Sequence, residues 1–161
     1  MDQTALIRFF EEGIPFNQHL GMKVLAMCGL QEAADHRSFG SCRVLIPFKP
    51  ALVGDPFRPA LHGGVLSTLA DTAGGLAVFA AVGTVEARVS TVDLRVDYYE
   101  PAALEDLEAE AEVVRLGNRV GVARIRLLQG TRLVGLKRAR RLQPKHATAV
   151  AMNPHSKDVH D

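Results

Sequence analysis

The 161-residue chain is short enough for one domain, and its 47% hydrophobic and 23% charged residues are ordinary values for a globular protein. Lysine and arginine number 19 against 18 aspartate and glutamate residues, so the net charge of +1 excludes a global field that attracts nucleic acid or an anionic membrane. We expect neither a signal peptide nor a membrane span, because residues 1–12 are amphipathic and no uninterrupted apolar run approaches about 20 residues. These features predict a soluble, cytoplasmic protein.

The N-terminal part of the chain predicts a short helix, two strands and a loop. Apolar residues on one side predict a helix over residues 4–12, and turn-forming residues follow over 14–21. Strands are predicted over 23–33 and 38–48, the second from its clear alternation of apolar and polar residues. Residues 49–60 hold three prolines and a glycine, which predicts a long loop of a kind that is often functional.

The rest of the chain predicts one long helix and four strands. The helix spans 62–82, and the strands follow over 87–99, 106–116, 120–129 and 132–142. Consecutive strands of this kind indicate an antiparallel sheet with the helix on one face, which is an α+β domain over residues 1–142. Its first 21 residues form a helix and turn segment. The polar residues 143–161 are expected to be a disordered tail.

Neither the cysteines nor the C-terminal histidines predict a metal site. Cys28 and Cys42 have no metal-ligand spacing and form no disulfide framework, so we expect both to be small core hydrophobes. Three of the six histidines lie in the polar tail, where solvated side chains are favoured over metal binding.

The predicted long helix has two faces, and neither is an ordinary solvent-exposed face. One face carries a stripe of leucine and alanine that suits packing on a sheet. The other carries Asp71, the only ionisable residue between Gly63 and Thr84, among small residues and two valines: Gly64, Ser67, Thr68, Gly75, Val78 and Val82. We expect a partner or a ligand to cover this second face. Asp71 is then either a structural carboxylate or a catalytic base or nucleophile with room for a substrate beside it.

The tripeptide His62-Gly63-Gly64 stands at the start of this helix. Backbone N–H groups in a first helical turn lack intrahelical partners and lie at the positive end of the dipole. Two glycines let another group approach that backbone closely. The arrangement suits a developing oxyanion in acyl transfer, although a plain strand-to-helix turn has the same residues.

Two stretches resemble a known family. Residues 61–72 (LHGGVLSTLADT) are similar to the helix-entry motif of hotdog-fold thioesterases of the phenylacetic-acid-degradation (PaaI-like) type. In that motif an acidic residue stands eight positions after the first glycine. Residues 89–101 (VSTVDLRVDYYEP) resemble the strand that follows the helix in the same family. The likeness spans residues 14–142.

The resemblance implies a hotdog fold, in which five or six antiparallel strands wrap around the long helix. It also implies an obligate homodimer, assembled into a homotetramer, with active sites at the dimer interface. By the same resemblance Asp71 acts as general base or nucleophile on a thioester. The N–H of Gly63 polarises the thioester carbonyl, His62 helps to position it, and Thr91 holds the hydrolytic water.

The sequence departs from the family's pattern at two positions. Some relatives carry Asn or Gln six residues before the motif histidine, where this chain has Pro56. The contact that orients the carbonyl is then lost, or it passes to Asn17 or His19. Some relatives carry a hydroxyl residue four positions after the acid, where Gly75 stands, and the neighbouring hydroxyl residues of the helix are candidate replacements.

Coenzyme A carries phosphates, so a local basic cluster is required. Residues 115–119 (RLGNR) form a basic turn that resembles the segment near the CoA phosphates in relatives. The candidate contacts there are Arg115, Gly117, Asn118 and Arg119. The basic run 137–141 is either a second ligand cluster or a solvated strand face that protects an edge. The candidate substrate contacts on the helix are Gly64, Ser67 and Thr68.

The predicted function is hydrolysis of an acyl-CoA with an aromatic or medium-chain acyl group, without a metal or any cofactor other than the CoA of the substrate. Two alternatives stay open: a hotdog hydratase or dehydratase, and a non-catalytic acyl-CoA-binding module. Phe48, Phe57 and Phe79 either line an acyl pocket or pack in the core.

Overall fold

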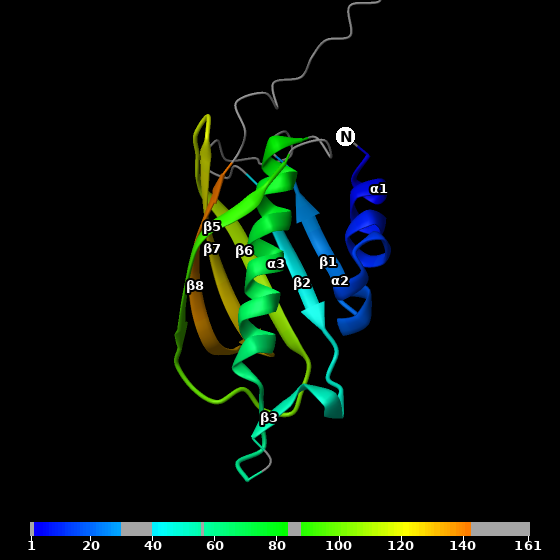
Figure 1. The fold of residues 1–161 in the computed structure, drawn as a ribbon, viewed down its shortest axis with the longest axis vertical. Helices are drawn as coiled ribbons and strands as arrows, with labels where there is room; N and C mark the ends of the chain where they lie inside the picture. Colours follow the sequence, from blue (N-terminus) through cyan, green and yellow to red (C-terminus); the bar gives the residue numbers. More distant parts are fainter. Residues whose placement is uncertain (1, 30–39, 56, 84–87, 143–161) are drawn as a thin grey trace, which may run out of the picture.

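The computed structural model describes residues 2–29, 40–55, 57–83 and 88–142, the last six by their backbone alone. One antiparallel sheet of six strands, in the order β1-β2-β6-β7-β8-β5, wraps around the long helix α3 (Gly63–Val82) (Figure 1). The strands are β1 (Lys23–Cys28), β2 (Ser41–Ile46), β5 (Ser90–Tyr98), β6 (Leu107–Leu116), β7 (Val120–Gln129) and β8 (Arg132–Leu142). The predicted α+β hotdog architecture is confirmed. The predicted tail, 143–161, and the predicted strand ends within 30–39 lie outside the described residues.

The N-terminal segment contains more helix than predicted. After α1 (Gln3–Arg8) and a π-helical turn, η1 (Phe9–Gly13), the stretch expected to be turns forms α2 (Pro15–Leu20). The prediction was wrong because Pro15 begins this helix and Gly21 ends it with a left-handed φ of 70°; both residue types mark helix ends as well as turns. Glu11 then accepts the Val24 N–H at 2.7 Å, so the segment covers the outer edge of β1.

The stretch predicted as a long loop is a short hairpin. A 3-10 turn, η2 (Pro50–Leu52), leads into β3 (Val53–Asp55), which pairs with β4 (Ala60–Leu61). The Asp55 carboxylate accepts the N–H groups of Phe57 and Arg58, at 2.9 and 3.1 Å. These backbone hydrogen bonds favour the charged form and lower the pKa of Asp55 below its ordinary value.

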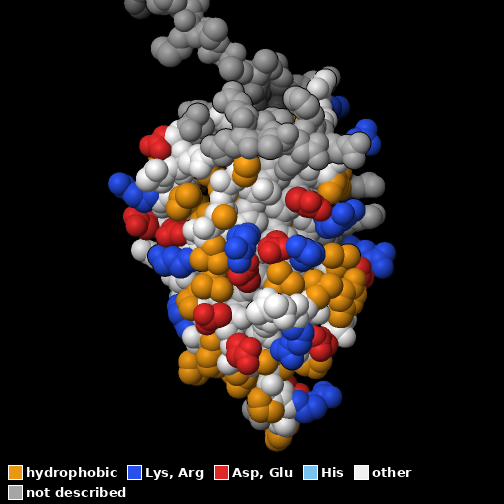
Figure 2. Space-filling view, turned by 180° about the vertical axis from the view of Figure 1, so that it is seen from behind, with side chains coloured by type: hydrophobic (Ala, Val, Ile, Leu, Met, Phe, Trp, Pro, Cys, Tyr) orange, Lys and Arg blue, Asp and Glu red, His pale blue; other side chains and the backbone are white. Residues whose placement is uncertain are grey.

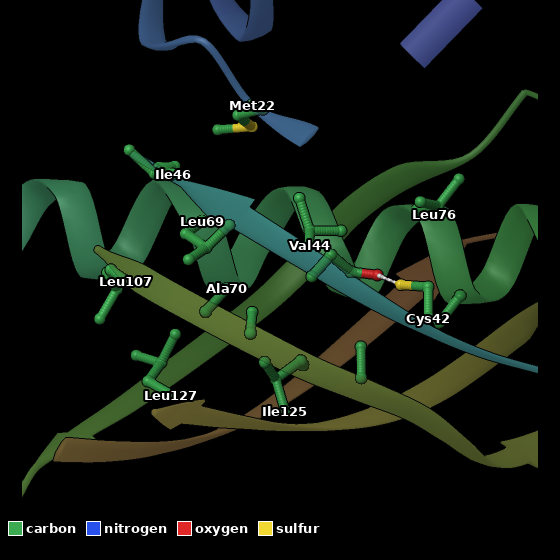
Figure 3. Packing of buried hydrophobic residues seen from close by; sticks show 14 of the residues in the cluster. Met22, Cys42, Val44, Ile46, Leu69, Ala70, Leu76, Leu107, Ile125 and Leu127 are labelled. Atoms are coloured by element: carbon green, nitrogen blue, oxygen red, sulfur yellow. Dashed lines mark hydrogen bonds between the residues drawn. The ribbon is translucent and has the colours of Figure 1, made fainter. Parts of the chain in front are cut away.

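The core lies between α3 and the concave face of the sheet (Figure 3). Leu69, Ala70 and Leu76 of the helix are fully buried against Val44, Ile125 and other residues of β2, β6 and β7. Each buried aliphatic side chain of this size stabilises the fold by about 1.5–3 kcal/mol. By length and composition α3 is also long and apolar enough to cross a membrane. However, 61% of its apolar window is buried inside the fold, as expected of a core helix.

Cys42 is part of this core, as predicted. Its side chain is 3% exposed, and its Sγ donates to the Ala73 carbonyl oxygen at 3.2 Å (Figure 3). Burial raises the pKa of the Cys42 thiol to about 12. Cys28 is only half-buried.

The outer face of the sheet carries charged side chains interspersed with apolar ones. Acidic and basic side chains alternate across it (Figure 2), and Arg43 pairs with Glu108 at 2.6 Å between β2 and β6. Exposed pairs of this kind contribute about 0–1 kcal/mol each. The alternation of buried and charged residues along β6 and β7 therefore explains why only one face of the sheet receives the helix.

Candidate active site

The turn into α3 is built by His62, Gly63 and Gly64. His62 is the N-cap residue, and its Nδ1 accepts the Gly64 N–H at 2.9 Å. A Cβ at position 64 would lie 2.8 Å from that Nδ1, so glycine lets the imidazole fold over the helix end. Because Nδ1 accepts a hydrogen bond, the neutral ring carries its proton on Nε2, where it can serve as a donor.

Gly63 is the first helical residue, and its N–H has no intrahelical acceptor. Within the described part of the chain no other group accepts from it either. The group is exposed at the positive end of the α3 dipole, and this position suits it to stabilise negative charge on a carbonyl oxygen.

Tyr98 lies over this turn from β5, although no sequence pattern marked it as a candidate site residue. Its hydroxyl donates to the Gly63 carbonyl oxygen at 3.1 Å and lies 2.6 Å from Ser67 Oγ. A Cβ at Gly63 would lie 3.6 Å from the Tyr98 ring, which is ordinary van der Waals contact. Alternation along β5 could have placed Tyr98 on the same face as Leu94 and Val96, but not above this particular turn.

Asp71 and Thr91 meet two turns further along α3. The Thr91 hydroxyl donates to Asp71 Oδ1 at 2.9 Å, and the carboxylate is half-buried. Strict alternation from Tyr98 would place Val92, rather than Thr91, on the side of the helix. A register shift between Thr91 and Asp93 in the pairing with β8 is a β-bulge, and it returns Thr91 to that side.

Within one chain, the turn that opens α3 lies apart from the pair formed by Asp71 and Thr91. Gly63 and Asp71 are eight residues apart on α3, so about 12 Å of helix axis separates them. The turn carrying Arg115, Asn118 and Arg119 lies further away, joining β6 to β7. A Cβ at Gly121, beside this turn, would lie 3.4 Å from Val78, near the C-terminal end of α3. Arg115 and Arg119 are exposed, and Gly117 closes the turn by donating to the Val120 carbonyl at 3.0 Å.

The second face of α3 is partly covered by the chain itself. Ser67 and Thr68 are half-buried, whereas Gly75 and Val78 are buried. The expectation that a partner or ligand covers those last two positions was wrong, because the curved sheet contacts the helix from β2 round to β8. The positions of this face that stay at least partly open are Gly64, Ser67, Thr68, Asp71 and Val82.

Other candidate residues have structural explanations. Asn17 is 3% exposed and donates from Nδ2 to the Phe10 carbonyl at 2.9 Å, so its side chain holds the N-terminal segment together. Phe48 and Phe79 pack against the core, and Phe57 is 93% exposed at the hairpin turn. Pro56 and the side chains of 137–141 lie outside the description.

No metal site accompanies these residues in the described part of the chain. It contains no group of three or more His, Cys, Asp or Glu side chains that could hold a metal ion. A carboxylate, a hydroxyl and an open N–H are the groups that acyl transfer to water requires.

Comparison with known proteins agrees with this chemistry. Residues 59–136 match the family model described as the thioesterase superfamily. A protein of Halobacterium salinarum that carries the name "Putative esterase" is 41% identical over 126 residues, which are 77% of this chain and 76% of that protein. The medium/long-chain acyl-CoA thioesterase YigI of Escherichia coli K12 is 30% identical over 71% of this chain and 75% of the YigI chain. A variant of the phenylacetic acid degradation protein PaaI from Thermus thermophilus superimposes with a TM-score of 0.67. It is 26% identical and covers 81% of this chain and 100% of its own.

The wrapped helix, with an acidic residue and an open N-terminal turn, defines a hotdog-fold thioester hydrolase. The chain belongs to the thioesterase superfamily.

Proposed function

We propose that the protein is a cytoplasmic acyl-CoA thioesterase that uses no metal and no cofactor beyond the CoA of its substrate. The observation that carries the proposal is the half-buried Asp71 carboxylate, which accepts from Thr91 at 2.9 Å on the helix that opens with the free Gly63 N–H. The acid supplies the base or nucleophile, and the N–H supplies oxyanion stabilisation.

The site requires two copies of the chain. A thioester carbonyl must lie about 3 Å from the N–H that binds its oxygen and about 3–3.5 Å from the attacking atom. The roughly 12 Å of helix axis between Gly63 and Asp71 prevents one chain from meeting both conditions. A second α3 running antiparallel to the first places Gly63 of one copy near Asp71 of the other. Two-fold symmetry then gives two equivalent sites.

Strand β5 is the surface through which we propose that the copies meet. It is an edge strand of the described sheet, and it exposes apolar side chains, with Val92 55%, Leu94 38% and Tyr98 52% exposed. An exposed apolar edge strand is a template for pairing with another strand. Antiparallel pairing of two β5 strands continues the sheet across the dimer. On the basis of the family resemblance, we also propose that the dimers assemble into a tetramer.

The reaction then has two possible first steps at Asp71. As a general base the carboxylate takes a proton from water, whose oxygen bonds to the acyl carbon. As a nucleophile it forms an anhydride that water later opens. In both cases the carbon–sulfur bond breaks and the CoA thiolate takes up a proton. Thr91 orients the carboxylate and holds the attacking water.

The CoA phosphates are proposed to bind the turn that carries Arg115 and Arg119. This turn lies near the C-terminal end of α3, about 10 Å of helix axis beyond the point where an antiparallel partner places the other copy's Gly63, and the length of CoA can span that separation. Gly64, Ser67 and Thr68 border the thioester. For the acyl group we propose an aromatic or medium-chain class, as the names of the thioesterase relatives suggest.

Mixing two inactive variants tests the shared site. Asp71→Asn removes the acid, and Gly63→Pro removes the N–H from the first helical position, where proline is well tolerated. Random assembly of the two chains makes half of the dimers mixed, and each mixed dimer has one intact site. We therefore expect the mixture to recover about a quarter of wild-type thiol release from acyl-CoA.

Four outcomes would contradict the proposal. No recovery in verified mixed dimers would mean that each site lies within one chain. Binding of acyl-CoA without thiol release by the wild type would favour a binding module, and hydration of an enoyl-CoA would favour a hydratase. A stable, active monomer in sedimentation at micromolar concentration would exclude the dimeric site.

A further inference from the structure

The first turn of α3 needs support from elsewhere in the fold. Glycine has the largest backbone freedom, and two glycines in succession stand where N–H groups lack intrahelical partners. Stabilising an oxyanion nevertheless requires an N–H that is fixed before the reaction starts, because reorganisation during the reaction weakens its effect. Some contact must therefore hold this turn in place.

Two side chains hold the peptide group that joins Gly63 to Gly64. His62 Nδ1 accepts its N–H at 2.9 Å, and the Tyr98 hydroxyl donates to its carbonyl oxygen at 3.1 Å. The same hydroxyl lies 2.6 Å from Ser67 Oγ, one helical turn further on. One oxygen atom of β5 thus joins two points of the first turns of α3.

We propose that Tyr98 is a positioning residue of the thioesterase site. Its hydroxyl fixes the turn so that the Gly63 N–H is directed at the thioester oxygen. The inference rests on the proposed function. It adds a residue that does not touch the thioester carbonyl and does not belong to the His62-Gly63-Gly64 motif. The hydroxyl acts on the reaction only through its two contacts on α3, the peptide group between Gly63 and Gly64 and the Ser67 hydroxyl.

The position of Tyr98 also connects the site to assembly. Tyr98 is 52% exposed and lies on β5, the free edge strand that we propose pairs with a second copy. Pairing fixes β5 from its other side, and the Tyr98 hydroxyl transmits that restraint to α3. The oxyanion-binding turn is then most rigid in the assembled protein, where Asp71 of the partner stands opposite it.

The test compares two single-atom deletions. Tyr98→Phe removes the hydroxyl and keeps the ring against Gly63. Tyr99→Phe is the matched control, since Tyr99 is 55% exposed on the same strand end and its hydroxyl has no hydrogen-bond partner among the described residues. These are the only two tyrosines of the chain. Both variants are measured for kcat and KM in thiol release from acyl-CoA and for the thermal midpoint.

We expect Tyr98→Phe to lower kcat about 5- to 20-fold, as the loss of one or two neutral hydrogen bonds allows, with KM changed less than about twofold. The thermal midpoint should stay within a few degrees of the wild type, and Tyr99→Phe should match the wild type in every measurement. A hydrogen bond with a purely structural role would instead lower the midpoint and leave kcat intact.

Ser67→Ala provides a second measurement from the helix side. It removes the closest partner of the Tyr98 hydroxyl, so kcat should fall in the same direction by a smaller factor. The double variant should be no worse than Tyr98→Phe alone, because both changes break one network. If Tyr98→Phe did not fold, an unchanged kcat in Ser67→Ala would overturn the inference.

The outcomes separate this inference from the proposed function. An active wild type with an equally active Tyr98→Phe variant overturns the role of Tyr98 alone. A rise in KM at unchanged kcat also overturns it, because Tyr98 would then be a binding contact. A wild type that releases no thiol from any acyl-CoA overturns both.

Discussion

Replacing Gly63 with proline and, separately, with alanine isolates the effect of the backbone N–H of this residue. Proline removes the backbone N–H, whereas alanine keeps it and adds a similar Cβ. That Cβ would lie 3.6 Å from the Tyr98 ring, which is ordinary van der Waals contact. His62 already has the extended backbone (φ −63°, ψ 132°) that a following proline requires, and proline is favoured at the first helical position.

The two variants should differ strongly in activity and have similar effects on stability. An N–H that binds the oxyanion contributes mainly in the transition state, so Gly63→Pro should lower kcat about 100- to 1000-fold. Gly63→Ala should keep kcat within a few-fold of the wild type. Both should stabilise the fold by about 0.4–1 kcal/mol, because each restricts the unfolded chain at a site with compatible backbone angles.

The assay is thiol release from an acyl-CoA at saturating concentration, with the thermal midpoint measured on the same preparations. A loss of kcat together with an equal or higher midpoint excludes misfolding as the cause. A kcat of Gly63→Pro within about fivefold of that of Gly63→Ala would refute the role of the N–H in the reaction.

Three further predictions follow from the same geometry. Asp71→Asn should fold normally and lose about two to four orders of magnitude in kcat, and near-wild-type turnover would remove Asp71 from the mechanism. Arg115→Ala or Arg119→Ala should raise KM for acyl-CoA about tenfold at nearly unchanged kcat; equal KM changes for an acyl-N-acetylcysteamine, which lacks the phosphates, would indicate a structural role. Because burial raises the pKa of Cys42 to about 12, a thiol reagent at pH 8 should modify Cys28 first and Cys42 only on unfolding, as mass mapping of the labelled protein would reveal.

The long periodic elements could be predicted from the sequence, and the short ones could not. The helix over 62–82 and the strands over 120–129 and 132–142 agree with α3, β7 and β8, because their hydrophobic periods persist over many residues. Strands β3 and β4 have only three and two residues, too few for any period to appear. Helix α2 has six residues between a proline and a glycine, which fits a turn equally well.

The site was predictable only as far as local sequence extends. The motif placed His62, Gly63 and Asp71 on one helix. It did not indicate that Gly64 leaves room for the imidazole to fold over the helix end, since that depends on the direction of one side chain. The contact of Thr91 with Asp71 depends on a β-bulge, and the pairing register that creates the bulge involves residues about 50 positions away.

The proposed dimer gives a reason for the small residues on α3. If Gly63 of each copy stands near Asp71 of the other, the two-fold axis passes the helix midway between them, at residue 67. There each helix approaches its own symmetry mate, so the residue is opposed to itself and must be small. Serine meets that requirement, and its hydroxyl is already engaged 2.6 Å from Tyr98 rather than directed at a like group across the axis. In this proposed dimer Ser67 would permit close approach of the helices and would also help to hold the turn proposed to bind the oxyanion. The proposed dimer requires a small residue at position 67, and the fixed turn requires a hydroxyl there; serine provides both.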